Sequence, residues 1–469
     1  MSQALALLRA EPRARLFFAA FAQSSLGTGA AYPALLVVAY SRYHSPWAIS
    51  LILLADFVPS GVVGPLLGAV VDRWPRMWCA AAADMLRAGG FVGIALVGGF
   101  EATLALALVA GVGKALFRPA VLAGIPNMVS HDRSAAATSL YGALNDFGMT
   151  GGPALAAATF LVVGPKELLV ANGATFVVSA LVLATLALAE TRAEPADERR
   201  RAPSLLRQAR EGLRATLHMP GIRVVMFAFA AGMFFGGVFN VIELPFATDA
   251  LGTGISGYSV LITVYGLGFV TGSLRGARGG TAPRLKRMYL IGLFLTGIGS
   301  LGAGASFALA LAIGAFGVGG FGNGLSVVHQ RLLFQSEVET GLQGRLFAVS
   351  DALMAWGFTL GFLAAGAMAA ASTPRTVMLV IGTGEVSLAA IAAAALRRQW
   401  VGPAGAPVLR APPVGASALG DGASALRQAE VRQQGTHLVD GTHFWLTLLD
   451  DIGERGDDMG VELGPGVPD

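Results

Sequence analysis

Six ionisable side chains lie inside long apolar stretches of this sequence, where a charge is energetically costly. They are Asp56, Lys114, Arg118, Asp146, Glu243 and Glu385. A charge at the centre of a bilayer costs about 2.5–3.5 kcal/mol on insertion scales, so such a residue is expected to serve a function or to pair with an opposite charge. The chemistry open to these groups is proton uptake and release, ion pairing, or contact with a cationic substrate.

The order of the stretches suggests how the charges pair. Lys114 lies in a stretch predicted to run inward and Asp146 in the next, which runs outward, so we expect the two side chains at similar depth, neutralising each other. Such a pair is either purely structural or couples protonation to conformational change, and both interpretations stay open. Asp56 has no cation nearby in the sequence. We predict that Asp56 and Asp146 carry protons and that Lys114 and Arg118 assist them.

Glu243 and Glu385 are candidates for a cavity, where they face solvent near a vestibule or contact a cationic substrate. Several aromatic residues and one methionine of the second half could form the apolar lining of a central cavity. They are Phe234, Phe235, Phe239, Met354, Trp356 and Phe358. The alternative for these side chains is ordinary packing against lipid, which is more common.

Catalytic and metal-binding constellations do not accompany these charges. The histidines of the apolar region stand singly at predicted helix ends or loops, without paired catalytic groups. They include His44, His131 and His329. Near the C-terminus, His437, Asp440 and His443 lack a further ligand cluster. The chain also has no Gly-x4-Gly-Lys-Ser/Thr sequence. We therefore expect no enzyme, no metal site, no cofactor and no ATP-driven pump.

The composition indicates that lipid surrounds most of the chain. Of 469 residues, 54% are hydrophobic and 13% are charged, and the mean hydropathy is +0.63. Soluble domains carry about 25% charged residues. The net charge is only +4, and the basic residues lie in short runs between apolar stretches, which disfavours nucleic-acid binding. With Cys79 as the single cysteine, no intrachain disulfide can form.

Apolar runs of about 20 residues predict membrane-spanning helices. The pattern predicts twelve of them, near residues 16–40, 47–71, 77–99, 102–125, 136–163, 167–189, 222–247, 256–279, 286–306, 308–333, 346–371 and 375–396. The chain is therefore expected to be an all-α membrane protein. Its predicted parts are an N-terminus (1–15), a first six-helix bundle (16–189), a basic linker (190–221), a second six-helix bundle (222–397) and a disordered tail (398–469).

The loop charges predict the topology. Arginines concentrate in the connections that follow even-numbered helices and in the linker, whereas the opposite loops hold little beyond Arg42, Lys166 and Arg375. Because arginine-rich loops stay cytoplasmic, both chain ends are expected in the cytoplasm.

The stretch from Gly64 to Arg76 carries small residues and then a charged turn, with key positions at Gly64, Gly68, Asp72, Arg73 and Arg76. It resembles the loop 2–3 signature of the major facilitator superfamily, although Met77 stands where a final basic residue is usual. The resemblance implies two pseudo-symmetric six-helix bundles and a gate in which Asp72 is a latch made in one conformation only. The alternative is a solvated turn that only marks the cytoplasmic side.

A second stretch, from Gly148 to Ala157, resembles the antiporter motif of the same superfamily, with Gly148, Gly152 and Pro153 as key residues and alanines in place of its last two glycines. Small residues let this helix pack closely, and Pro153 bends it. An ordinary packing face is the alternative interpretation.

Further stretches at 84–87, 117–126 and 344–347 resemble the drug:proton antiporter branch that includes macrolide-efflux and enterobactin-exporter proteins, and the resemblance covers most of residues 15–397. It implies a monomeric secondary active exporter in a bacterial inner membrane. Its substrate would be a small hydrophobic or amphipathic compound, such as a drug or secondary metabolite, exchanged for protons by alternating access. Such exporters often confer antibiotic resistance. A siderophore exporter, an importer on the same fold and a transport-inactive membrane sensor are the alternatives.

Overall fold

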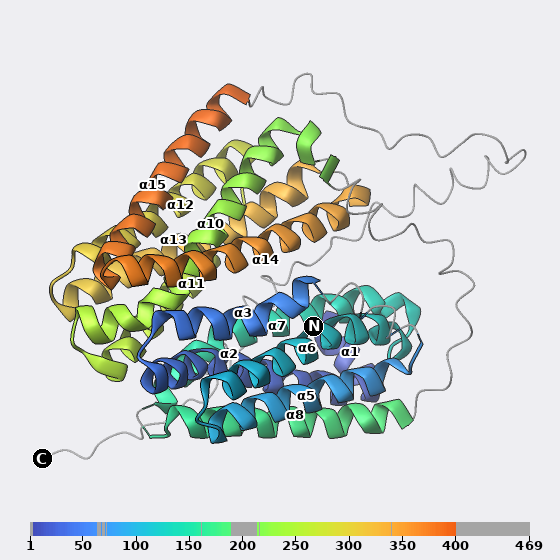
Figure 1. Cartoon of the computed structure of the whole chain (residues 1–469). Coiled ribbons are helices and arrows are strands. Elements are labelled where there is room, and N and C mark those ends of the chain that lie inside the picture. Colours follow the sequence, from blue (N-terminus) through green and yellow to red (C-terminus); the bar gives the residue numbers. More distant parts are fainter. Residues whose placement is uncertain are drawn as a thin grey trace, which may run out of the picture. The chain divides into compact units, whose positions relative to one another are not determined.

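Helices account for all regular structure that the computed structural model of the chain describes (Figure 1). The described residues are 3–62, 67, 71, 73–160, 162–188, 213–214, 216–338 and 340–399. The chain divides at Arg397 into two compact units, residues 1–397 and 398–469. Most of the predicted linker, all but two residues of the predicted tail, and the group of His437, Asp440 and His443 lie outside the described residues.

The helices of the first half are α1 (Gln3–Ala10), α2 (Pro12–Tyr43), α3 (Pro46–Val62), α5 (Arg76–Leu96), α6 (Phe100–Gly124), the short turns η1 (Ile125–Asn127) and η2 (His131–Arg133), α7 (Ser134–Thr159) and α8 (Pro165–Leu188). Those of the second half are α10 (Pro220–Pro245), the π-helix η4 (Phe246–Ala250), α11 (Gly254–Gly276), α12 (Ala282–Ala305), α13 (Leu309–Glu337), α14 (Thr340–Ala371) and α15 (Pro374–Gln399). A described helix overlaps each of the twelve predicted ranges.

Within the described part of the chain, nine helices are long and apolar enough to cross a bilayer. The remaining predicted spans correspond to α2, α3 and α7. The apolar segment described in α3 is short, from Pro46 to Ser60. Helices α2 and α7 are long but rich in alanine, glycine, serine and threonine, which makes them less apolar. These same small residues let α2 and α7 approach each other closely.

Prolines mark several helix boundaries. Pro12 and Pro220 lie in the first turns of α2 and α10. The N–H groups of a first turn have no hydrogen-bond partner within the helix, so a proline there costs no hydrogen bond. Pro245 closes α10, and the chain continues directly as the π-helix η4. A proline removes a backbone donor, and wide turns of this kind are frequent at functional sites.

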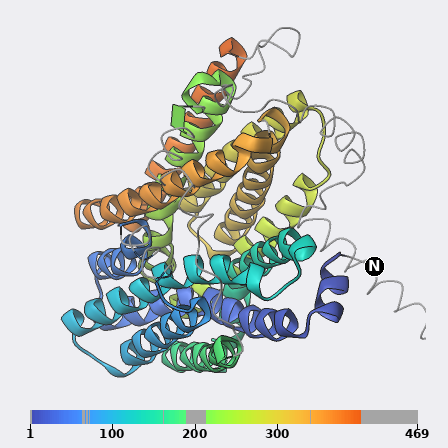
Figure 2. The ribbon, with the colours of Figure 1, turned by 90° about the vertical axis from the view of Figure 1, so that its right-hand side faces the viewer.

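The two halves repeat the same internal contacts. In the first half α5 packs on α6, α3 on α6 and α2 on α7; in the second half α12 packs on α13, α11 on α13 and α10 on α14. Between the halves, α3 packs against α14 and α7 against α11. Figures 1 and 2 both show α14 beside α3. The largest cluster of buried apolar residues draws on both halves, so van der Waals packing of apolar side chains contributes to this interface.

The N-terminal segment is attached to the connection between α6 and α7 through Glu11. Its Oε1 accepts hydrogen bonds from the Ser130 N–H (3.3 Å), the Ser130 hydroxyl (3.1 Å) and Arg133 Nη1 (3.1 Å). The bond from the Ser130 N–H, reinforced by the others, lowers the pKa of Glu11 from its ordinary value. The same hydrogen bonds therefore favour the charged form of this carboxyl group.

Candidate functional site

Asp56 and Lys114 form an ion pair between α3 and α6. Lys114 Nζ donates to Asp56 Oδ2 at 3.0 Å, and the two side chains are 37% and 11% exposed. The same ammonium group lies 4.2 Å from the centroid of the Phe57 ring. Phe57 contacts Phe358 and Phe362 of α14, with both centroid distances at 5.7 Å. The Lys114 ammonium group thus interacts with both the Asp56 carboxylate and the ring of Phe57, and Phe57 is part of the contact between the two halves.

The predicted pairing of Lys114 with Asp146 is wrong: Lys114 pairs with Asp56, which has no cation nearby in the sequence but meets one in the fold. Helix α6 packs against α3 and α5, whereas α7 packs against α2 and α11. Two charges at equal depth in consecutive helices therefore need not form an ion pair, because the two helices face different neighbours.

Two ion pairs cross from one half to the other. Arg118 Nη2 of α6 donates to Asp351 Oδ2 of α14 at 3.0 Å, and Arg331 Nη1 of α13 donates to Asp146 Oδ2 of α7 at 2.9 Å. Each pair joins an arginine on the fourth predicted span of one half to an aspartate on the fifth span of the other. We call the end of the helices where α6 passes into α7 the arginine-rich end, since the connections with Arg133 and Arg278 lie there.

These crossing pairs are weak enough to break. The side chains are 62% and 47% exposed in the first pair and 54% and 52% in the second. Pairs with such exposure contribute about 0–1 kcal/mol each. They can therefore favour one arrangement of the halves without preventing another.

The sequence analysis did not single out Arg331 or Asp351, the second-half partners of the crossing pairs. Both residues lie inside predicted spans, 308–333 and 346–371, so the criterion that selected the first six ionisable residues applies to them as well. An ionisable side chain inside an apolar span therefore identifies Arg331 and Asp351 from the sequence as well.

Asp84 and Arg87 of α5 were likewise not selected as membrane charges, yet they form a buried pair. Arg87 Nη1 donates to Asp84 Oδ1 at 3.0 Å, and Nη2 donates to the Thr28 hydroxyl of α2 at 2.9 Å. The guanidinium also stacks over the Phe176 ring of α8, 3.9 Å from its centroid. Arg87 therefore joins three helices within the first half, which is a structural role.

Glu243 and Glu385 are buried, at 7% and 8% exposure, and so do not face solvent as expected. Glu243 Oε1 accepts a hydrogen bond from the Tyr258 hydroxyl at 3.1 Å, and Glu385 Oε2 accepts one from the Ser300 hydroxyl at 3.0 Å. Among the residues that the structure describes, neither glutamate forms an ion pair with a cation. They are the two buried carboxyls of the second half whose charge is not balanced locally.

The apolar residues predicted for a central cavity occupy different environments. Phe239 stacks with Tyr265 and packs on Phe316, both within the second half. Trp356 is 58% exposed. Phe358, in contrast, contacts α3 through Phe57. The exposure of Trp356 matches the alternative of packing against lipid, whereas Phe239 packs inside the second half.

The gate motif is described only in part. Gly64, Gly68 and Asp72 lie outside the described residues, so the latch stays a prediction. Arg73 is exposed, whereas Arg76 is buried and its Nη1 donates to the Ala123 carbonyl at 2.7 Å. Arg76 thereby fixes the start of α5 to the end of α6.

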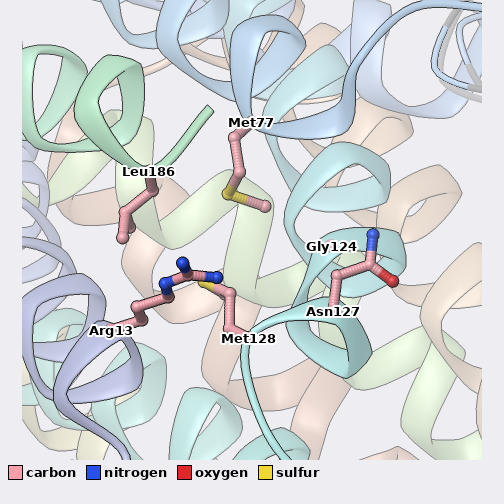
Figure 3. Close-up of a pocket in the computed structure, with 6 residues that line it drawn as sticks. All are labelled: Arg13, Met77, Gly124, Asn127, Met128 and Leu186. Atoms are coloured by element: carbon pink, nitrogen blue, oxygen red, sulfur yellow. The ribbon is translucent and has the colours of Figure 1, made fainter. Parts of the chain in front are cut away.

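Met77 lies in a small pocket at the arginine-rich end of the first half (Figure 3). The other lining residues are Arg13, Gly124, Asn127, Met128 and Leu186. The pocket has a volume of about 10 Å³, and a single water already needs about 10–15 Å³. It is too small for an organic substrate.

The antiporter-like stretch forms the contact of α7 with α2. A Cβ atom added at Gly152 would lie 2.3 Å from the carbonyl carbon of Gly29, and one added at Gly148 would lie 2.5 Å from that of Ser25. Only glycine permits backbones this close. Pro153 follows inside the same helix. The stretch is a packing face, and its role in antiport stays a prediction.

The end opposite the arginine-rich end has its own contact between the halves. The Tyr40 hydroxyl at the end of α2 donates to Asp249 Oδ2 in η4. Nearby, Arg42 donates to the Ile94 and Ala95 carbonyls at the end of α5, and Arg375 donates to the Gly304 carbonyl at the end of α12. The two arginines occupy equivalent places in the two halves. Both neutralise helix C-termini, which explains their presence at an end that otherwise avoids positive charge.

We expect removal of one partner of the Asp56–Lys114 pair to destabilise the protein more than removal of both. Asp56→Asn or Lys114→Gln alone leaves one group without its counter-charge, whereas the double variant leaves none. Thermal unfolding of the purified variants in detergent measures the difference. Additive losses in the double variant would mean that the two side chains do not interact.

Comparison with known proteins supports this architecture. Residues 16–272 match the sequence profile of the Major Facilitator Superfamily. The chain is 32% identical over 142 residues to the fosmidomycin resistance protein of Escherichia coli K12, which covers 30% of this chain and 33% of that protein. It is 21% identical over 336 residues to macrolide efflux protein A of Streptococcus pyogenes, covering 68% of this chain and 80% of that one.

Among solved structures, a bacterial homolog of the human lysosomal transporter Spinster, inward-facing and unoccupied, superimposes with a TM-score of 0.65 at 16% identity, over 84% of this chain and 99% of that chain. This likeness shows the fold alone.

Proposed function

The chain belongs to the major facilitator superfamily of secondary transporters, and we propose that it exports a small hydrophobic or amphipathic compound in exchange for protons across a bacterial plasma membrane. Its partners are accordingly a small-molecule substrate, protons and the lipid bilayer. We further propose that twelve spans form two pseudo-symmetric bundles, within residues 16–189 and 222–397, with both chain ends in the cytoplasm.

The observation that carries this proposal is the pair of weak ionic contacts between the halves. Alternating access requires that contacts at one end of the transporter break while those at the other end form. Arg118–Asp351 and Arg331–Asp146 join the halves near the arginine-rich end, and Tyr40–Asp249 joins them at the opposite end. All three contacts are polar, partly exposed and therefore reversible, as such a cycle needs.

Export is favoured over import by two further observations. The antiporter-like stretch from Gly148 to Pro153 brings α7 directly against α2. The two curated relatives named above are resistance and efflux proteins by name. The compound class is supported by the macrolide in the name of one relative and by the apolar character of the contact between α3 and α14.

Accumulation of erythromycin, fosmidomycin and ethidium in an efflux-deficient bacterial host tests the proposal. Cells that produce the chain should contain less of at least one compound than cells with an empty vector, and a protonophore should abolish the difference. Deleting residues 402–469 should leave export intact, since these residues follow the last predicted span in the sequence. Raised accumulation would indicate import, and an effect of the tail deletion on cell response without any flux would indicate a sensor.

A further inference from the structure

Glu385 borders an internal cavity of the second half, between α10, α12, α13 and α15. Its polar lining consists of Tyr289, Thr296, Asn323, Ser326 and Glu385. The cavity measures about 30 Å³, which suffices for about one or two water molecules and for nothing larger. It lies inside one bundle and not between the halves, so the compound exported cannot use it.

The hydroxyl groups around the cavity present acceptors to it. The hydroxyl hydrogens of Tyr289, Thr296 and Ser326 are directed to main-chain carbonyls, at 3.2, 2.9 and 2.9 Å. A hydroxyl has one hydrogen and two lone pairs, so these groups can only accept further hydrogen bonds. The cavity therefore suits a species that donates hydrogen bonds, such as a water molecule, a hydronium ion or a protonated carboxyl group.

Ser300 allows Glu385 to exist in either protonation state. The Ser300 hydroxyl oxygen lies 3.0 Å from Glu385 Oε2 and 3.2 Å from the Thr296 carbonyl oxygen. When Glu385 is ionised, Ser300 donates to the carboxylate. When Glu385 has taken a proton from cavity water, the new O–H can donate to Ser300, whose own hydrogen then turns to the Thr296 carbonyl. The hydrogen bond between Ser300 and Glu385 is kept in both states, and no helix has to move.

The groups that face Glu385 leave its charge unbalanced. From α12 the titratable neighbour is Tyr289, and from α11 it is Tyr265, which lies within electrostatic range. The cavity linings from α10 and α13 contain no titratable side chain, and α15 itself adds none besides Glu385. Within the described residues, the charge state of Glu385 therefore depends on a proton and not on a lysine or arginine partner.

A polar link leads from the cavity toward the other half. Asn323 Nδ2 donates to the Tyr265 hydroxyl at 2.8 Å. An amide has a second N–H and a carbonyl oxygen, so Asn323 can bind Tyr265 and the cavity water at once. Tyr265 belongs to α11, which packs against α7 across the contact between the halves. Asn323 and Tyr265 thus connect the cavity to the helix that packs against the other half.

We propose that Glu385 is the proton-binding group of the antiport cycle, placed within the second bundle and apart from the path of the exported compound. In each cycle Glu385 takes one proton from cavity water in one conformation and returns it to water in the other. This inference rests on the proposed antiport function.

Infrared difference spectroscopy of the full chain in phosphatidylethanolamine and phosphatidylglycerol vesicles tests proton binding without any substrate. Between pH steps, the wild type should show the carbonyl band of a buried carboxylic acid that titrates. Glu385→Gln keeps the shape and the bond from Ser300 but has no proton to release, so this band should disappear. Glu101→Gln, at an exposed glutamate in the first turn of α6, is the matched control and should keep it.

Ser300→Ala provides a variant that keeps the carboxyl group. It removes the hydroxyl that serves both protonation states, so the band should remain and its pH midpoint should move. Ser387→Ala, on the exposed side of α15, should leave the midpoint unchanged. An identical spectrum for Glu385→Gln and the wild type at every pH would overturn the inference, even if the chain exports compounds.

Proton movement in the same vesicles, followed with an enclosed pH indicator after addition of whichever compound the accumulation test identifies, separates the two proposals. Glu385→Gln should lose proton-coupled flux and retain exchange of labelled for unlabelled compound. Proton-coupled flux at the wild-type rate in Glu385→Gln, or wild-type flux that requires Na⁺ in place of protons, would overturn the role of Glu385. Absence of proton movement in the wild type would refute antiport itself, and the spectra would still decide whether Glu385 binds a proton.

Discussion

Arg118→Asp should reduce export several-fold, and the addition of Asp351→Arg should restore much of it. The single reversal places two carboxylates where an arginine and an aspartate now lie 3.0 Å apart, so the halves repel each other at the arginine-rich end. The conformation that needs this contact then becomes less populated. The double variant exchanges the partners and recovers the attraction. Efflux from loaded cells, with the compound identified in the accumulation test, measures both effects.

The equivalent exchange at Asp146 and Arg331 should behave in the same way, because that pair occupies the related position between α7 and α13. Arg15→Asp, at an exposed arginine near the start of α2, is the control for a general effect of negative charge at this end. Export by Arg118→Asp at the wild-type rate would show that the crossing pairs do not take part in the cycle. Failure of the double variant, if it is folded, would contradict the pairing.

Gly152→Ala should destabilise the protein strongly, whereas Gly151→Ala should be tolerated. At Gly152 a Cβ atom would meet the Gly29 backbone at 2.3–2.4 Å, and backbone cannot rotate aside as a side chain can. At Gly151 the nearest atom would lie 3.5 Å away, which is ordinary contact. Overpacking costs about 1–3 kcal/mol and sometimes more, and the rigid contact at Gly152 places its cost at the upper end.

Thermal unfolding of both variants in detergent, followed by size-exclusion chromatography, measures this difference between neighbouring residues of one motif. Helix propensity favours alanine at both positions, so a propensity effect would raise both melting temperatures. Equal melting temperatures would show that α7 and α2 do not pack as closely as described. A loss confined to Gly152→Ala confirms that the antiporter-like stretch is first of all a helix contact.

The sequence by itself indicated that lipid surrounds most of the chain, and it located the helices approximately. Hydrophobicity is a local property, and an apolar run long enough to span a bilayer can satisfy its backbone only as a helix or in a closed barrel. The predicted ranges therefore coincide with described helices from α2 to α15. The sequence also pointed to most of the ionisable residues of the candidate site, because a charged residue within an apolar run can be recognised without knowing the fold.

The partners of those charges were decided by the tertiary structure alone. Lys114 is bound to Asp56, and Asp146 to Arg331, because α6 packs on α3 and because α7 faces the second half. Which helices touch depends on how small and large residues fit along whole helix faces, far apart in the chain, and no local pattern records that fit. For the same reason only the folded chain reveals that Glu385 lies beside a water-sized cavity with Ser300 as its hydrogen-bond partner.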